Sequence, residues 1–427
     1  MTDSPATASQ AAETIIRDRG SPWRGQFLAW GFLLLSFAVF VVAVVFLPAR
    51  IASVVGRLTI EAPLEAHPIE GTVLLQGPFD TAWKQLRDSA EATPGTRFST
   101  DGRSRAFMEF FDGSTLELYN NTEMVLLESE RGRFDEARKR VVLELVRGRM
   151  AMGVAHTDAE ESRHVEIQTP TGHMLLLEGS YVVEVFEDEH VEVLVRRGKA
   201  TFFSEGNLAE VGAGGRGGYG PDMTPTADLP PLAALVDDSR LALPLNLSPW
   251  RAFIATESGP NGRTIEIATD ADPGDVPGLG RDFGYAFRRM SGSEEVNRHG
   301  EAGIAQIVNR DVRDFAELHI RARVRVDYQG LSGGGSLGTE YPIMIKLFYI
   351  DSHGQDQIWY QGFYAQNDEG FSVSGGTEVP AGEWVLYDNP NLLQVLNPTP
   401  VFVRRIEVLG SGWDFDAVVT EVVLEGR

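Results

Sequence analysis

The sequence predicts an all-β ectodomain of two units that follows one N-terminal transmembrane helix. Three features predict this fold class: long runs in which apolar and polar residues alternate, glycine-containing turns between these runs, and one uncharged apolar stretch near the N-terminus. Alternation with a period of two gives a strand one apolar face, which must pack against a core. The 427 residues are enough for two or three domains, and 43% hydrophobic and 23% charged residues are typical of folded protein.

Composition excludes several classes of function. The net charge of −23 would repel phosphate backbones, so we expect no nucleic-acid partner. The sequence has no cysteine, which excludes disulfides, cysteine-ligated zinc, iron–sulfur clusters and thiol nucleophiles. The eight histidines form no zinc-binding motif, and we expect no cofactor and no metal.

Residues 27–47 read FLAWGFLLLSFAVFVVAVVFL, which is 21 residues without a charge. As a helix this stretch would span roughly 30 Å, about the thickness of the hydrocarbon core of a membrane. The apolar cores of signal peptides are shorter, about 7–15 residues, so an uncleaved signal anchor is favoured over a cleaved signal. The lipid bilayer is therefore an expected partner.

The arginines that flank this stretch favour one orientation. Three arginines precede it and two follow it: Arg17, Arg19 and Arg24, then Arg50 and Arg57. The positive-inside rule then favours a cytoplasmic N-terminus. We expect a single-pass protein of the plasma membrane whose C-terminal domains are extracytoplasmic.

The expected organisation follows from the order of these patterns. It comprises a disordered cytoplasmic tail (1–26), the transmembrane helix (27–47), a stalk (48–68), a first β domain (69–220), a proline-rich linker (221–249) and a jelly-roll β-sandwich (250–427).

Within the first β domain, Asp112-Gly113 separates two alternating runs and predicts a hairpin. Phe79, Trp83 and Leu86 would share one face of a short helix, with Asp80 as its N-cap. Residues 212–220, GAGGRGGYG, predict a flexible end to the domain, because the stretch lacks the Lys-Ser/Thr of a phosphate-binding loop.

In the C-terminal unit, residues 318–327 alternate strictly between apolar and polar side chains. Residues 342–350 and 357–365 flank the turn DSHGQD and predict a hairpin. The last strand, 417–424, is expected in the middle of a sheet, because its valine pairs would be buried on both sides. Several such strands with glycine-rich loops are typical of a two-sheet sandwich of jelly-roll type.

The first β domain resembles the FecR family. The resemblance rests on an ordered series of short motifs: Gly95, Thr100, Arg105-Ala106, Asp112-Gly113-Ser114, Asn121-Thr122, Arg147-Gly148-Arg149, Thr169-Pro170, Gly179-Ser180 and Val195–Gly198. The family usually has Gly-Thr where this chain has Gly179-Ser180. The similarity covers residues 69–220, about a third of the chain.

The resemblance implies a β domain exposed outside the membrane. The best-known members of the family are envelope regulators that pass a signal to a cytoplasmic sigma factor through a folded cytoplasmic domain. This chain has only 26 residues before the apolar stretch. From the resemblance we therefore expect only a role in sensing or scaffolding, which is narrower than the signalling role of the best-known members.

Two sets of charged residues are candidate sites. Asp270, Asp272 and Asp275 alternate as calcium ligands can, although a solvated acidic loop explains them as well. Arg321, Arg323 and Arg325 would share one face of a strand. They could bind an anionic glycan or lipid head group, or they could pair with carboxylates on neighbouring strands.

Aromatic residues are dense in the last domain, and Trp359, Tyr360, Tyr364 and Trp384 are candidates for ligand binding. Tyrosine and tryptophan combine an apolar face with a polar tip, which suits stacking on sugars. Trp359 and Tyr360 would point to opposite faces of one strand, so that one of them belongs to the core.

We find no catalytic motif in the sequence and expect no enzyme. The expected function is that of a membrane-anchored, non-enzymatic FecR-like envelope protein that acts in extracytoplasmic sensing, scaffolding or binding of a glycan or envelope protein. One alternative is a carbohydrate-binding or adhesion protein that uses the C-terminal sandwich. A second alternative is a transmembrane regulator of a sigma factor.

Overall fold

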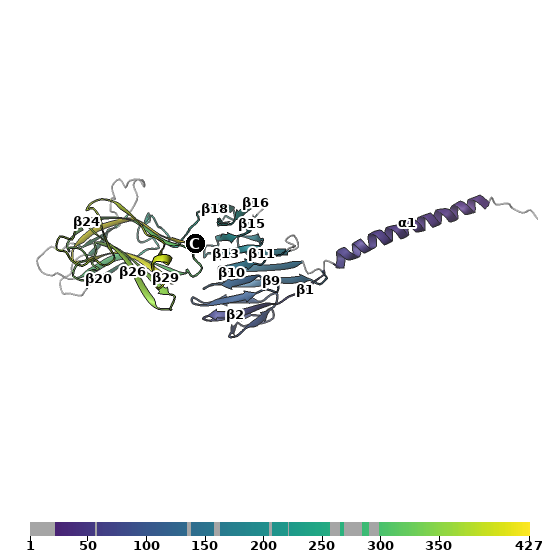
Figure 1. Cartoon of the computed structure of the whole chain (residues 1–427), viewed down its shortest axis with the longest axis horizontal. Coiled ribbons are helices and arrows are strands. Elements are labelled where there is room, and N and C mark those ends of the chain that lie inside the picture. The colour runs from purple at the N-terminus through teal and green to yellow at the C-terminus, as the bar shows by residue number, and fades with distance from the viewer. Residues whose placement is uncertain are drawn as a thin grey trace, which may run out of the picture.

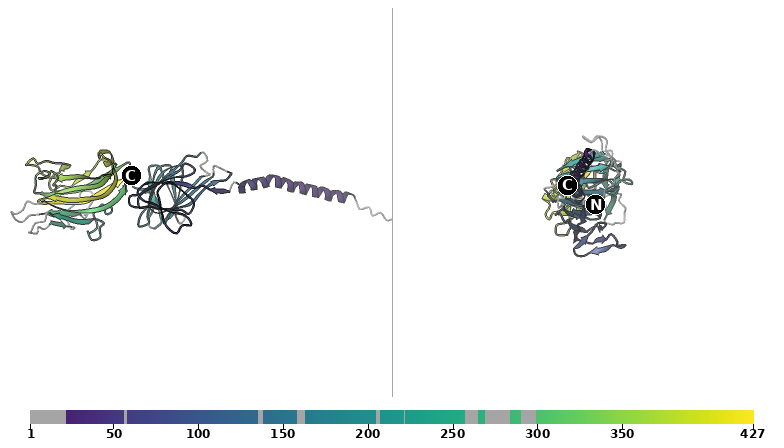
Figure 2. Two further views of the ribbon diagram at one scale, coloured as in Figure 1. Left: turned by 90° about the horizontal axis from the view of Figure 1, so that it is seen from below. Right: turned by 90° about the vertical axis from the view of Figure 1, so that its right-hand side faces the viewer.

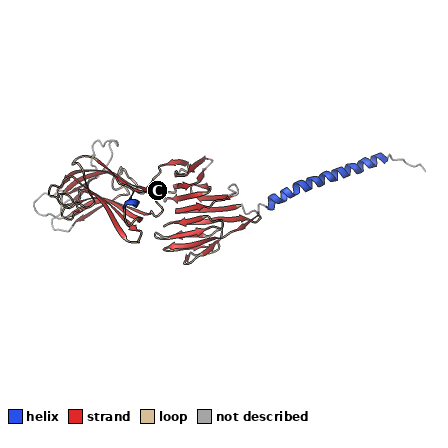
Figure 3. Ribbon diagram, in the orientation of Figure 1, coloured by secondary structure: helices blue, strands red, loops and turns tan. Residues whose placement is uncertain are grey.

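The computed structural model of the chain describes residues 22–55, 58–134, 138–157, 163–204, 207–220, 222–256, 265–268, 284–289 and 299–427. One long helix, a first β unit and a second β unit follow one another in space as they do in sequence (Figure 1). Apart from one short helix in the second unit, the helices and strands that the structure describes in the two β units are all strands (Figure 3). The predicted all-β class is therefore confirmed.

Helix α1 (Pro22–Val55) contains the uncharged stretch 27–47. Its large apolar side chains that the structure describes, from Phe27 to Phe46, are 41–73% exposed. No helix within the described residues is long and apolar enough to cross a membrane. The transmembrane role of residues 27–47 stays a prediction.

The first β unit, here called the barrel, is a closed system of hydrogen-bonded strands around one apolar core. Its strands are β1 (Thr59–Glu61), β2 (Leu64–Glu70), β3 (Val73–Gln76), β4 (Lys84–Leu86), β5 (Ala90–Ala92), β6 (Arg97–Thr100), β7 (Arg105–Glu109), β8 (Thr115–Leu118), β9 (Glu123–Gly132), β10 (Lys139–Val154), β11 (Arg163–Thr169), β12 (Gly172–Leu176), β13 (Gly179–Val185), β14 (Val191–Arg197), β15 (Lys199–Ser204), β16 (Asn207–Gly212), β17 (Arg216–Tyr219) and β18 (Pro225–Leu229).

Strand β10 belongs to both faces of the barrel. Residues 139–147 of β10 pair with β9 and β11, whereas residues 148–154 pair with β8 and β13. Gly148 lies at the crossover with a φ of +86°, and a Cβ there would lie 2.6 Å from the carbonyl oxygen of Asn121. Only glycine fits this position without strain, since it has no side chain and tolerates positive φ.

The Asp112-Gly113 hairpin is confirmed, because β7 and β8 pair across it and Gly113 has a φ of +80°. The helix predicted around Trp83 is wrong. Residues 84–86 form strand β4, and Phe79 is 98% exposed. Asp80 accepts hydrogen bonds from Lys84 instead of capping a helix, so the apparent helical face was produced by a turn followed by a short strand.

The glycine-rich stretch 212–220 is also different from the prediction. Arg216–Tyr219 form strand β17, all four residues are buried, and β17 pairs with β14 and β18. A Cβ at Gly218 would lie 1.8 Å from the carbonyl oxygen of Val191. The glycines therefore permit close packing of neighbouring backbones, and they do not mark a loose end of the domain.

This packing predicts that Gly218→Ala destabilises the protein by about 1–3 kcal/mol, the usual cost of overpacking a filled interior. The matched control is Gly212→Ala, because no atom lies within 4 Å of a Cβ at Gly212. We expect that control to change stability by less than about 0.5 kcal/mol. Equal midpoints of urea unfolding for the two variants would show that the close approach at Gly218 is unimportant.

The second β unit, here called the sandwich, packs two sheets around a separate core. One sheet has the order β21 (Ile265–Ala268), β22 (Tyr285–Arg289), β30 (Phe415–Gly426), β24 (Leu318–Gln329) and β28 (Val385–Asp388), with β19 (Ala233–Ala234) also paired to β30. The other has the order β20 (Arg251–Thr256), β23 (Gly300–Asp311), β29 (Pro400–Gly412), β25 (Ile343–Asp351), β26 (Asp356–Tyr364) and β27 (Gly376–Glu378). Helix α2 (Leu392–Val395) is a single turn.

The main predictions for this unit are confirmed. Strands β25 and β26 form the expected hairpin, and β30 lies between β22 and β24 in the interior of its sheet. The two units pack end to end, as the perpendicular views also show (Figure 2). The residues expected to form a stalk include the end of α1 and strands β1 and β2, and those expected to form a linker include β18 and β19.

Candidate functional site

The two β units meet through a set of charged residues that we call the interdomain joint. Its barrel side consists of Glu70, Arg105, Tyr119, Arg149, Glu184 and Arg196, and its sandwich side of Arg310, Asp311, Arg313, Asp314 and Phe315. The sandwich residues follow one another at the end of β23. The joint therefore consists of a short charged segment of the sandwich and the residues of several barrel strands that it contacts.

Arg149 and Asp314 form the centre of the joint. The Arg149 Nη2 donates to Asp314 Oδ2 over 2.6 Å, and the side chains are only 7% and 8% exposed. Arg149 Nη1 also donates to the backbone carbonyl of Asp311 over 3.0 Å. The guanidinium lies 4.7 Å from the ring centre of Tyr119 and 5.0 Å from that of Phe315. A planar cation between two rings, with charged and carbonyl acceptors, is held in one orientation.

The residues of the FecR-like motifs position Arg149. The backbone N–H of Arg149 donates to Thr122 Oγ1, and that hydroxyl donates to the Arg149 carbonyl, both over 2.9 Å. Thr100 Oγ1 in turn accepts from the Thr122 N–H over 2.9 Å and donates to the Tyr119 carbonyl over 2.6 Å. Together with Gly148, these two threonines fix the backbone from which Arg149 reaches the sandwich.

Further ion pairs surround this centre. Arg310 makes two hydrogen bonds to the carboxylate of Glu184, and Arg196 contacts Asp314 over 2.7 Å. Burial disfavours the charged form of Arg310, but the charge and hydrogen bonds of Glu184 together with the charges of Asp314 and Glu192 outweigh it and raise the pKa of the guanidinium. Burial also raises the pKa of Tyr119 beyond its ordinary value, so this phenol remains neutral in the joint.

A cleft of about 420 Å³ opens beside the joint, between the barrel and the sandwich. The barrel contributes the turns around Arg103 and Asn120, and the sandwich contributes the ends of β23, β25 and β29. Its volume lies within the range of small-molecule sites. Because both units line the cleft, its shape depends on the joint.

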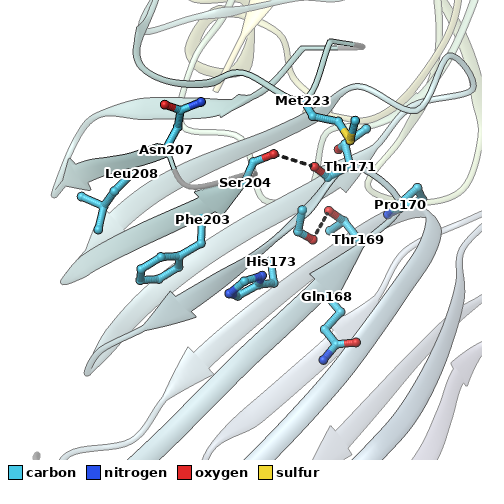
Figure 4. A pocket seen from close by; sticks show the side chains of 11 residues that line it. Gln168, Thr169, Pro170, Thr171, His173, Phe203, Ser204, Asn207, Leu208 and Met223 are labelled. Atoms are coloured by element: carbon cyan, nitrogen blue, oxygen red, sulfur yellow. Dashed lines mark hydrogen bonds between the residues drawn. The ribbon is translucent and has the colours of Figure 1, made fainter.

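A second hollow, of about 660 Å³, lies on the barrel at the turn between β11 and β12 (Figure 4). Phe203, Leu208 and Met223 supply apolar surface, and His173 stacks on Phe203 with ring centres 5.2 Å apart. Thr169 Oγ1 closes the turn by donating to the Gly172 carbonyl. Among the lining residues that the structure describes there is no carboxylate, lysine or arginine, so these residues offer less chemistry than those of the interdomain cleft.

The arginine candidates lie on the outer face of the sheet that contains β24, and their partners are carboxylates. Arg321 approaches Glu421 and Glu425, with nitrogen–oxygen distances of 3.4 and 3.8 Å, and Arg323 approaches Glu421 at 3.8 Å. Arg325 contacts Asp327 over 2.8 Å, and its guanidinium lies 4.8 Å from the ring of Trp384. The sequence left two possibilities open for these arginines: binding of an anionic glycan or lipid head group, or pairing with carboxylates on neighbouring strands. The geometry matches the pairing with carboxylates.

The aromatic candidates lie on different surfaces. Trp359 packs against the sandwich core beside the fully buried Phe363, which confirms that one face of β26 is core. Tyr360 and Tyr364 pack on the opposite face with Tyr341, whose ring stacks with that of Tyr364 at 6.3 Å. Trp384 directly precedes β28 of the other sheet, so the aromatic candidates do not form one surface.

The calcium candidates Asp270, Asp272 and Asp275 lie outside the described residues. In the part of the chain that the structure describes, no group of three or more histidines and carboxylates is arranged to hold a metal ion.

A separate charged cluster lies on the outer face of the sheet that contains β25. His299 Nδ1 lies 2.9 Å from Glu340 Oε1, and Glu301 Oε1 accepts from Lys346 Nζ over 3.0 Å. The pKa of His299 is raised by its contact with Glu301 at 3.8 Å and by its hydrogen bond to Glu340, which outweigh its partial burial. The contact with His299, together with Lys346, lowers the pKa of Glu301 to about 2.

These shifts predict that this cluster contributes most to stability in mildly acidic solution. The contribution of His299 is fully present below its ordinary pKa of 6.5 and is lost as the pH rises through the raised value. The contribution of Glu301 is present above its ordinary pKa of 4.5 and is lost as the pH falls towards about 2. We expect His299→Gln to lower the free energy of unfolding by about 1 kcal/mol near pH 5.5, a modest value because the pair is partly screened by solvent. The loss should be much smaller at pH 9, where the contribution of His299 is no longer present.

Thermal unfolding at several pH values would measure this difference. His353→Gln is the matched control, since His353 is exposed and its ring makes no hydrogen bond or ion pair among the described residues and interacts with Asp351 through its charge alone. Parallel pH profiles for the two variants would contradict the role assigned to His299.

The joint was not predicted from the sequence, although Arg149 lies within one of the FecR-like motifs. A signal was present in residues 310–314, Arg-Asp-Val-Arg-Asp, where two cations and two anions are concentrated at the end of a strand. Such a segment is usually solvated, and only the position of the barrel shows that its charges are buried.

The fold and the joint define a two-unit β protein whose barrel holds a β-sandwich through buried ion pairs. Within it, residues 96–201 match the family model described as FecR protein. The resemblance recognised from the sequence is thereby confirmed for these residues, which include Thr100, Thr122 and Arg149. No curated protein matches the chain.

Solved structures are similar in parts of the chain. A proposed anti-sigma factor from Parabacteroides distasonis has 17% identity and a TM-score of 0.25, with 31% of this chain and 59% of that chain covered. A family 11 carbohydrate-binding module of Clostridium thermocellum has 11% identity and a TM-score of 0.25, with 46% of this chain and 95% of that chain covered. A family 61 module bound to β-1,4-galactotriose has 13% identity and a TM-score of 0.23, with 42% and 90% covered.

Proposed function

We propose that this protein is a membrane-anchored, non-enzymatic FecR-like protein that acts outside the membrane in sensing, scaffolding or partner binding. The observation that carries this proposal is the joint. Thr100, Thr122 and Arg149 belong to the segment that matches the FecR model; the two threonines position Arg149, and Arg149 contacts the sandwich. A barrel that fixes a second domain in place suits presentation of that domain to a partner.

The anchor in this proposal is residues 27–47. This stretch has 21 residues and no charge, and its described side chains are exposed all along α1. Large contiguous apolar surface of this kind is rare on soluble proteins and is stabilised by lipid or by another protein.

The absence of native cysteine allows a direct test of the topology. A cysteine introduced by Ser352→Cys would be an exposed thiol in the sandwich, and one introduced by Ser4→Cys would lie in the N-terminal tail. With a membrane-impermeant maleimide, we expect labelling of the first variant in intact spheroplasts and of the second only after the spheroplasts are lysed. Labelling of neither before lysis, or of the tail alone, would refute the proposed orientation.

A carbohydrate-binding role for the sandwich is a second candidate. Tyr341, Tyr360 and Tyr364 gather on the outer face of the sheet around β26, where Tyr360 and Tyr364 remain half-buried. Tyrosine rings at such positions can stack on sugar faces. On a glycan array, Tyr360→Ala should abolish binding that Ile358→Ala retains, since Ile358 is exposed on the same face. An array without signal for the unaltered chain would count against this role.

Regulation of a sigma factor is the remaining alternative, and the FecR match supports it in general terms. It requires that residues 1–26 contact a cytoplasmic protein. A peptide of these residues should then retain a sigma factor from a cell extract, whereas a peptide of the same composition in scrambled order should not. Retention by both peptides or by neither would argue against regulation.

A further inference from the structure

The cleft beside the joint has cationic groups that the joint does not use. Among the described residues, the guanidinium of Arg103 makes no hydrogen bond or ion pair and interacts with the carboxylate of Asp101 through its charge, and its side chain is exposed. Arg404 has a single partner, Asp356, at 2.9 Å, and both of these side chains are solvent-accessible, at 39% and 71% exposure. Such an exposed pair contributes little and is easily exchanged for another anion.

The carboxylates of the cleft are already engaged. Glu70 and Asp311 both contact Arg313, at 2.8 and 3.1 Å. The carboxylate of Asp351 accepts from the backbone N–H groups of His353 and Gln355, at 2.8 and 3.0 Å, and so closes its own turn. The described lining of the cleft has four arginines and three carboxylates and so carries one excess positive charge, in a chain whose net charge is −23.

The rest of the lining is neutral and suits a polar organic ligand. The side-chain amides of Asn120 and Asn309 make no hydrogen bonds among the described residues, and each offers both donors and an acceptor. Ile350 and Phe402 are half-buried and supply apolar surface between the charged groups. Free inorganic anions need no such surface or acceptor, whereas a hydroxylated carboxylate uses all three kinds of group.

We propose that the interdomain cleft binds a small carboxylate that carries hydroxyl groups, such as a sugar acid. Arg103 and Arg404 bind the carboxylate, one from each unit, and Asn120 and Asn309 bind hydroxyl groups. The ligand would then bridge the barrel and the sandwich. This inference deepens the binding role proposed above by naming its site and ligand class, and it does not depend on the membrane topology.

Isothermal titration of the detergent-solubilised full chain tests the inference. The probes are digalacturonate and citrate as hydroxylated carboxylates, cellobiose as a neutral saccharide and inorganic phosphate as a simple anion. We expect a measurable Kd for at least one carboxylate, no binding of cellobiose, and at least tenfold weaker binding of phosphate. Arg103→Gln and Arg404→Gln should each raise the Kd about tenfold, which corresponds to the loss of about 1.4 kcal/mol.

Arg131→Gln is the matched control, because Arg131 is an exposed arginine on the barrel outside the cleft. The Kd of this variant for the carboxylate should equal that of the unaltered chain. Circular dichroism would show whether the cleft variants remain folded, as expected for exposed side chains. Binding of neither carboxylate, equal binding of cellobiose or phosphate, or an unaltered Kd in both cleft variants would overturn the inference. Those results would leave the maleimide topology test unaffected, and a failed topology test would leave the titration unaffected.

Discussion

Replacing Arg149 by methionine is expected to lower the free energy of unfolding by about 3–5 kcal/mol, the usual cost of removing one partner of a buried ion pair. Arg149 is 7% exposed and its partner Asp314 is 8% exposed, so the remaining carboxylate would stay largely buried. Arg196 also contacts Asp314 and would compensate in part. Urea unfolding followed by circular dichroism measures the loss.

Arg131→Met is the matched control for this change, because Arg131 is exposed on the same barrel, and we expect an effect below about 0.5 kcal/mol. Combining Arg149→Met with Asp314→Leu removes both charges, and the double variant should recover much of the stability lost by the first change. A small effect of Arg149→Met, comparable to that of the control, would mean that the two units are not held together by this pair.

Trp250→Ala should destabilise the sandwich by about 3–5 kcal/mol, the range found for removing a large aromatic side chain from a core. Trp250 is fully buried, packs within the sandwich core, and donates from its indole N–H to the Asp238 carbonyl over 3.3 Å. The change therefore leaves a cavity and also frees the segment before β20, which the indole ties to the core.

The control is Trp384→Ala, because Trp384 is only half-buried and lies against Arg325 on an outer face of the same unit. We expect about 1 kcal/mol for that variant, since exposed cation–ring contacts contribute ~0.5–1 kcal/mol. Similar losses of stability for the two variants in urea unfolding would contradict the central position of Trp250 in the core.

Local patterns predicted most of the fold correctly. The alternation at residues 318–327 and the turn at Asp112-Gly113 depend on nearest neighbours in the chain, and both produced the expected strands. The valine pairs of β30 also identified an interior strand, because a strand buried on both faces must be apolar on both. These features need no knowledge of which strands are adjacent.

The errors arose where distant contacts decide the outcome. The glycines of β17 are required by the backbone of Val191, which lies far away in the sequence, so composition alone suggested flexibility. Phe79 and Trp83 fit a helical spacing, but strand pairing with β3 determined the structure there. Tertiary pairing overrides a three-residue pattern easily, since the intrinsic preferences involved are small.

For the charged sites, the sequence predicted the kinds of residue involved but not the positions of their partners. The sequence identified Arg321, Arg323 and Arg325 as a charged face, but their partners on β30 become adjacent only through sheet order. The joint could not be placed at all, because it requires the relative position of two separately folded units. The FecR-like motifs pointed to the correct strand without showing what Arg149 contacts.

The crossing of β10 between the two faces of the barrel has a mechanical consequence. Arg149 follows Gly148 directly, so tension applied to the sandwich through Arg149 would act on the one strand that pairs on both sides of the crossover. Pulling the two ends of the chain apart in an optical trap would thus apply force to the barrel at the crossover, where β10 is hydrogen-bonded to strands of both faces. The sandwich should unravel first, while the barrel withstands a higher force.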